Sequence, residues 1–204
     1  MTAASSLKST GVCKLLISLF WVRLGFAIVT TLFSVIEVAL PSLYQIITVI
    51  DGLQAIGVLV INLSSAIVFI IWIHRIHADL KNLFTDYPIT PGGALARFLI
   101  PFYNIWGIWN TLSTFAEWFN KEGGDLISLS NKLKSLIPFL YAFTFISRGL
   151  DRILFRQAFS EQGEIDPILL LISCVVDVGL AVALLLVSKT MGKILTQKVK
   201  REVT

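Results

Sequence analysis

The sequence has few of the residues that build covalent frameworks or metal centres, with two cysteines and two histidines in 204 residues. Cys13 and Cys174 form no CxxC pair and fall at the start of the first apolar stretch and inside the last, so we expect no disulfide between them. His74 and His77 share a helix face by spacing, but neither an HExxH motif nor a third histidine completes a site. We therefore expect no cofactor, and keep the two histidines as the alternative metal or haem ligands.

Motifs for catalysis and for phosphate binding are also missing. The chain has no GxxxxGK[ST] loop and no arrangement of a nucleophile beside a base. Small polar residues inside apolar stretches, such as Asn62, Ser64 and Ser65, are expected to form hydrogen bonds between helices. The net charge of +4 does not predict nucleic-acid binding, because the basic residues are distributed as membrane topology requires. The sequence favours a non-enzymatic protein.

What the sequence has in excess is apolar residues. They make up 55% of the chain, and the mean hydropathy is +0.80. Residues 53–73 carry no charge, and residues 167–188 carry only Asp177. A helix needs roughly 20 apolar residues to cross a hydrocarbon core of about 30 Å. The chain is therefore expected to be a multi-pass integral membrane protein, forming a single membrane domain over residues 1–204.

The apolar stretches and the basic residues together predict an all-α bundle with four transmembrane helices. Lys and Arg are absent from residues 24–74 and 157–188, and short basic loops stay in the cytoplasm. Both termini are accordingly expected in the cytoplasm. The expected segments are spans at about 15–40, 53–79, 135–156 and 167–194, a mobile N-terminus 1–11, an external link 42–52, a polar loop 120–134 and a basic tail 195–204.

The uncharged stretch 98–116 is long enough to be a fifth span, but charge placement argues against it. A fifth crossing would put the basic tail opposite the basic N-terminus, so we expect residues 94–118 to enter and leave by the cytoplasmic face. Pro101 would break the helix, and Trp106 and Trp109 favour the headgroup level. The segment is expected to be re-entrant or interfacial, with an ordinary fifth span as the alternative.

Charged residues inside the spans are the candidate functional groups. Arg23, Arg148 and Asp177 are expected near the midplane, where we predict a buried Arg148–Asp177 pair with Arg23 competing for the same carboxylate. Arg148, Arg152 and Arg156 form a stripe at i, i+4, i+8, and Glu37 could meet Arg152 or Arg156. These groups either neutralise one another or line a path for protons or anions.

Glycines in the spans suggest where helices pack closely. Gly25 and Gly179 are expected to allow close approach, because a helix without a side chain at the contact can come nearer to its neighbour.

Two stretches resemble a bacterial family of small membrane proteins described as domain of unknown function 4328. One is the WIHRIHADL stretch containing Trp72, Arg75 and Asp79. The other is a Pro-Gly-Gly followed by FLIPFYNIW, which contains Pro101, Asn104 and Trp106. Histidines replace aromatic residues at 74 and 77, and Asp79 stands for Asn. The resemblance implies four spans with a Pro/Asn/Trp insertion between the second and third, and it implies no established activity.

These observations predict a protein that binds or stabilises partner membrane proteins. The expected partners are the lipid bilayer and other membrane proteins, or a second copy of the chain, and not nucleic acid. The expected location is a bacterial inner membrane or a thylakoid-type internal membrane. The contact surface would come from the bare helix faces and from exposed aromatic residues (Phe98, Phe102, Tyr103, Trp106 and Trp109). A small channel or transporter using the intramembrane charges is the second interpretation, and a haem- or metal-binding protein is the third.

Overall fold

The computed structural model describes residues 7–160 and 164–203, which form helices without any strand. The all-α prediction is therefore confirmed for this part of the chain. Three helices, α1, α2 and α6, are long and apolar enough to cross a membrane. The helices are α1 Ser9–Ala39, α2 Pro41–Leu83, α3 Pro91–Leu99, α4 Pro101–Lys121, α5 Asp125–Ala158 and α6 Pro167–Val203.

The connections are shorter than the sequence suggested. The expected external link 42–52 is helical, since only Leu40 separates α1 from α2, and Pro41 occupies the first turn of α2. Proline suits that position because its missing N–H would have no helical partner there. The expected polar loop 120–134 is also mostly helical. It contracts to three residues around Gly123 and Gly124, whose φ angles of +75° and +57° glycine adopts without strain.

The chain does break at the proline of the uncharged stretch. Helix α3 ends at Leu99, Ile100 is extended, and Pro101 opens α4. Thr90 caps α3, its hydroxyl accepting a hydrogen bond from the Gly93 amide at 3.0 Å. At the other end, residues 1–6 of the expected mobile N-terminus lie outside the described residues, and α1 already begins at Ser9. The four long helices extend beyond the spans expected for them.

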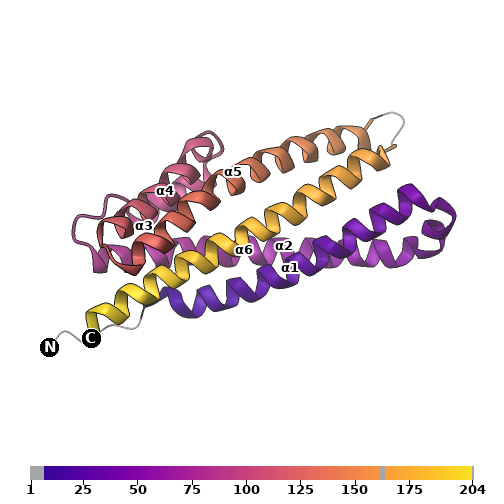
Figure 1. Ribbon diagram of the computed structural model, residues 1–204. Helices are drawn as coiled ribbons and strands as arrows, with labels where there is room; N and C mark the ends of the chain where they lie inside the picture. Colours follow the sequence, from indigo (N-terminus) through magenta and orange to yellow (C-terminus); the bar gives the residue numbers. More distant parts are fainter. Residues whose placement is uncertain (1–6, 161–163, 204) are drawn as a thin grey trace.

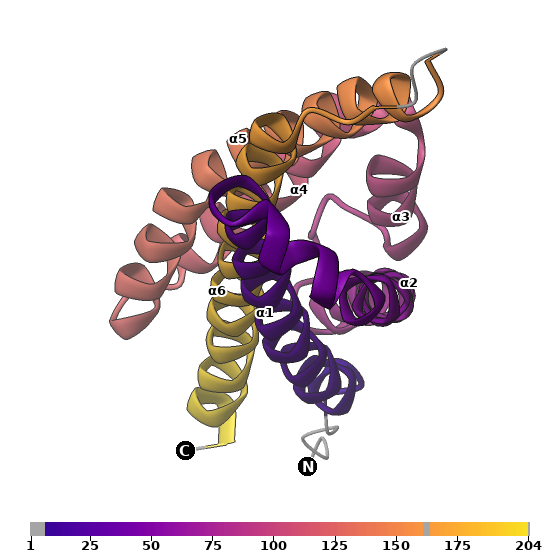
Figure 2. The ribbon, with the colours of Figure 1, turned by 90° about the vertical axis from the view of Figure 1, so that its right-hand side faces the viewer.

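The six helices form a ring in which each packs on its neighbours in sequence, and α6 closes the ring against α1. Figure 1 shows α3 and α4 at the end of the molecule that holds both termini, where they lie between α2 and α5. Figure 2, turned by 90°, shows α2 and α5 on different sides of α1 and α6. The short helices therefore bridge α2 and α5 at one end only.

The hydrophobic core lies at this bridged end. Its large buried side chains come from α1, α2, α4, α5 and the α2–α3 link, and include Phe20, Trp72, Tyr87, Phe115, Phe119 and Leu133. Many apolar side chains elsewhere are exposed, with Ile46, Val49 and Leu59 each at least two-thirds accessible. Contiguous exposed apolar surface of this kind marks a membrane or protein contact. On helices long enough to span, it fits a lipid-facing surface.

Candidate functional site

The register of α5 against α6 sets the depth of the charged residues. Ser147 donates to Asp177 Oδ1 at 2.7 Å, and a Cβ at Gly179 would lie 2.5 Å from the Phe143 ring. In an antiparallel pair these contacts bring residues 136–157 of α5 beside the apolar stretch 167–188 of α6. The polar part of α5 therefore runs along the most apolar part of its neighbour.

The predicted Arg148–Asp177 ion pair is not formed within the described residues. Arg148 instead donates to Asn104 Oδ1 at 3.2 Å, and the Asn104 amide donates to the Phe98 carbonyl at 3.5 Å. The carboxylate of Asp177 is taken by Ser147, one residue earlier on α5. Depth along a helix follows from counting residues, but successive side chains differ by about 100° in direction. That rotation turns Arg148 toward α4.

Arg23 shares a cavity with Asp177. The two residues and Asn62 line an internal space of about 60 Å³ between α1, α2 and α6. Arg23 also lines a second, open groove of about 390 Å³, together with Arg148 and Asp151. The predicted midplane cluster is thus gathered around Arg23, without an ion pair among its described members.

Glu37 takes part in a different polar group. It lines a cavity of about 220 Å³ with Tyr44, Asp51 and Gln54, in which the Tyr44 hydroxyl donates to Asp51 at 2.6 Å. Gln54 donates to Thr30 on α1 at 2.7 Å. These contacts join α1 and α2 near their connection, and the carboxylates of Glu37 and Asp51 lie there.

The predicted meeting of Glu37 with Arg152 or Arg156 is not seen in the part of the chain that the structure describes. Both arginines are exposed on α5. Helix α5 contacts α4 and α6, whereas Glu37 sits on α1 facing α2. The arginine stripe therefore points away from the acidic group expected to neutralise it.

The first signature stretch holds the beginning of α1. Asp79 is buried, and its two carboxylate oxygens accept the backbone amides of Lys8 at 3.2 Å and Ser9 at 2.9 Å. The Arg75 guanidinium reaches the Lys8 carbonyl at 3.4 Å. A carboxylate at a helix N-terminus satisfies unpaired amides and favours the helix dipole. Asp79 thus caps α1 from α2, while Trp72 lies in the core.

The second signature stretch divides its roles. Pro101 begins α4, and Asn104 is buried and links α3 to Arg148. Trp106 is 59% exposed, and Phe102 is 90% exposed. The helix break at Pro101 could be expected from the sequence. The hydrogen bond that joins Asn104 to Arg148 is seen only in the packed structure.

The two histidines do not face a common site. His77 is fully buried, with Nδ1 2.8 Å from the Ile73 carbonyl, whereas His74 is exposed. No group of three or more His, Cys, Asp or Glu residues that could hold a metal occurs among the described residues. Although their spacing suggested a shared helix face, His77 lies in the core and His74 lies on the surface.

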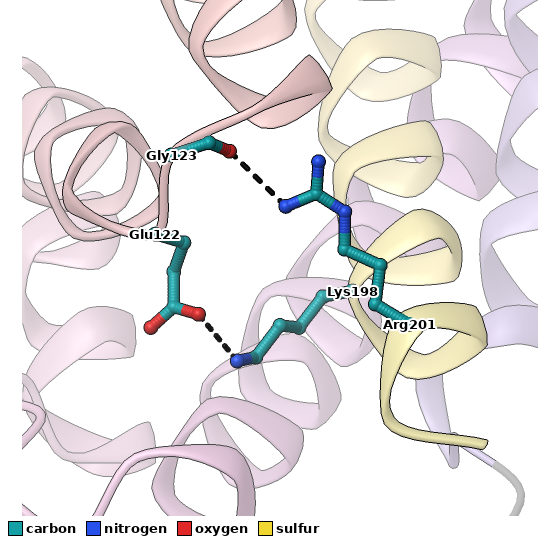
Figure 3. A network of polar contacts seen from close by, with 4 residues as sticks. All are labelled: Glu122, Gly123, Lys198 and Arg201. Carbon is teal, nitrogen blue, oxygen red and sulfur yellow. Dashed lines mark hydrogen bonds and ion pairs between the residues drawn. The ribbon is translucent and has the colours of Figure 1, made fainter. Parts of the chain in front are cut away.

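Sequence reasoning missed the contacts of the basic end of α6. Lys198 pairs with Glu122, and Arg201 donates to the Gly123 carbonyl at 3.1 Å, as Figure 3 shows. Arg201 also lies 3.9 Å from Asp125. These contacts fasten the tail to the α4–α5 turn. The sequence does show a glycine-rich turn with acidic residues at 122–125. The basic residues that contact this turn follow it by more than seventy residues, so the pairing could not be predicted.

A comparison of the chain with models of protein families, with curated proteins and with solved structures gives no match in any of the three.

Proposed function

We propose that this chain is a non-enzymatic integral membrane protein that binds a partner membrane protein along the groove between α2 and α5. One observation carries the proposal. The groove of about 390 Å³ is lined by Arg23, Arg148 and Asp151 together with apolar side chains, and it opens beside helices that would lie in lipid. Arg148 and Asp151 are exposed on α5.

Lipid is a poor occupant for this groove. With α5 beside the apolar stretch of α6, Arg148 lies about 15 Å from the outer end of α6. A charge near the centre of a bilayer costs roughly 2.5–3.5 kcal/mol on insertion scales, and such groups pair with one another or face a protein interior. The groove and the stripe of Arg148, Arg152 and Arg156 carry more positive than negative charge. A transmembrane helix bearing a carboxylate is the complementary occupant.

The proposal includes a topology. We infer that α5 is a fourth span, that α3 and α4 enter and leave by the cytoplasmic face, and that both termini are cytoplasmic. Support comes from the basic residues at the ends of α2, α4 and α6. Exposed Phe102 and Trp106 on α4 suit a helix at the headgroup level. From the resemblance to the domain of unknown function 4328 family, we propose a bacterial inner membrane or a thylakoid-type internal membrane as the location.

Site-specific photocrosslinking tests the partner. A photoreactive residue at Leu99 suits the test, since Leu99 lines the groove and is 54% exposed. The matched control is Leu59 on α2, which is 68% exposed and lies outside the groove lining. We expect Leu99 to crosslink to a second, different polypeptide and Leu59 to crosslink to lipid. Lipid adducts alone at Leu99 would contradict the proposal, and a crosslinked dimer of the chain would replace the partner by a second copy.

A polar path is the second candidate, because three cavities follow one another through the helices. The cavity of Glu37 shares Thr30 and Val58 with the cavity of Asp177, which shares Arg23 with the open groove. Proton flux into proteoliposomes would test the path. We expect Asp177→Asn to abolish flux if the path conducts, while Asp86→Asn in the α2–α3 link leaves it unchanged. Equal flux in both variants and in empty vesicles would exclude conduction.

A further inference from the structure

A second large cavity lies between α1 and α6, at the end of the molecule that holds the termini. Its volume is about 600 Å³, within the range of small-molecule sites. The floor is apolar and includes Leu7, Ile17 and the buried Trp72. None of the described residues lines both this cavity and the groove or the polar cavities described above.

The rim of this cavity is basic. Lys14 on α1 and Lys189, Lys193 and Lys200 on α6 all line it, and none of the described lining residues is acidic. The Lys189 ammonium lies 4.6 Å from the centre of the Trp21 ring, which holds that charge at the rim. Lys14, Lys189 and Lys193 gathered around one hollow favour an anionic occupant.

The basic residues of α6 divide between two faces. Lys198 and Arg201 face the α4–α5 turn, where Glu122 and Asp125 accept them (Figure 3). Lys189 and Lys193, four residues apart, lie on the face toward α1. The protein thus supplies carboxylates for one face of the tail, and the cavity on the other face has none among its described lining residues.

The depth of the cavity matches the membrane surface. Cys13 lies 3.9 Å from the Ser188 carbonyl, and a Cβ at Gly192 would lie 2.7 Å from the Cys13 sulfur, so α1 and α6 meet at this level. The charge-poor stretch of α6 ends at Ser188, and Lys189 follows directly. Basic pockets between membrane helices on the cytoplasmic side receive anionic headgroups.

We propose that the cavity between α1 and α6 binds the headgroup of an anionic phospholipid. Lys14, Lys189 and Lys193 contact the phosphate region, and the acyl chains leave along the apolar floor toward Ile17. A soluble anion would use the lysines alone. The apolar floor and the position at the end of the span favour a ligand that is itself part of the bilayer.

Native mass spectrometry of the full chain in detergent tests the proposal with dioleoylphosphatidylglycerol as the probe. Dioleoylphosphatidylcholine, with the same acyl chains and no net charge, is the lipid control. We expect Lys14→Gln/Lys193→Gln to weaken phosphatidylglycerol binding about 30-fold, from the contribution of each basic residue near an anionic surface. The matched variant Lys132→Gln/Lys134→Gln removes the same charge from exposed positions on α5 and should bind as the wild type does.

Three results would overturn the proposal. One is an equal loss of affinity in both double variants, which would indicate general attraction to the basic tail. Another is equal affinity for the two lipids. The third is binding of inorganic phosphate as strong as that of the lipid. Should the first variant fail to fold, Thr196→Glu places a carboxylate on the exposed wall and keeps every lysine, and unchanged affinity there would equally refute the site.

Discussion

Replacing Asp79 by alanine should loosen the start of α1. The carboxylate accepts the amides of Lys8 and Ser9 at 3.2 Å and 2.9 Å, across 71 and 70 residues of sequence. Removing it leaves both donors without an acceptor. Ser9 is buried, so water cannot easily replace the lost bond, whereas Lys8 is exposed and its amide can be solvated.

The magnitude follows from this difference in burial. Leaving a buried donor unsatisfied costs about 1–3 kcal/mol, which applies to the Ser9 amide. Losing the longer bond to the solvated Lys8 amide costs roughly 0.5–1 kcal/mol. We therefore expect Asp79→Ala to lower the free energy of unfolding by about 2–4 kcal/mol. Asp79→Asn keeps one acceptor oxygen without the charge, so about half of the loss should remain.

Equilibrium unfolding in mixed micelles measures the free energy, and amide hydrogen exchange locates the change. We expect exchange at residues 8–10 to accelerate in Asp79→Ala. The control is Asp86→Ala, which removes an exposed carboxylate from the α2–α3 link. A loss of less than about 0.5 kcal/mol, which is typical of a surface substitution, would refute the cap. Destabilisation with unchanged exchange at residues 8–10 would place the effect elsewhere.

Three further outcomes are expected. Gly107→Ala should lower stability by about 1 kcal/mol, because its Cβ would lie 2.7 Å from the Arg97 Cβ and push α3 from α4; urea or detergent unfolding measures it. Gly149→Ala, with open space around the Cβ, should be neutral or stabilising by up to about 1 kcal/mol in the same assay. Burial raises the pKa of Tyr87, so the neutral phenol is favoured in the folded state and stability should fall as pH rises above about 10. Thermal unfolding of Tyr87→Phe should lose this dependence of stability on pH, whereas the control Tyr103→Phe should keep it.

The existence of the long helices could be predicted from the sequence, but their ends could not. Hydropathy reports which residues tolerate lipid, whereas a helix continues wherever its backbone bonds are satisfied. Residues 42–52 looked like a link because they contain Ser42, Asp51 and Gly52, yet they continue α2 from Pro41. Asp51 accepts a hydrogen bond from the Tyr44 hydroxyl within this helix.

Side-chain directions were harder to predict than depths. Gly179 does allow close approach, to Phe143, whereas the same expectation for Gly25 is wrong because its Cβ would meet no atom within 4 Å. Arg148 was placed at the depth of Asp177 but turns to Asn104. A single sequence gives position along a helix axis, and the rotation of each helix depends on all its neighbours at once.

The ring of helices has a consequence for assembly order. Every strongly packed pair is consecutive in the chain except α1 and α6, which meet across 175 residues at the Cys13–Ser188 contact. Each helix can thus settle against its predecessor as synthesis proceeds, at roughly 5–20 residues per second. The α1–α6 contact is the one in which the first helix must wait for the last. Contacts so distant in sequence form late, so misassembly would begin at the α1–α6 interface. A lipid bound between these two helices would stabilise the interface once it has formed.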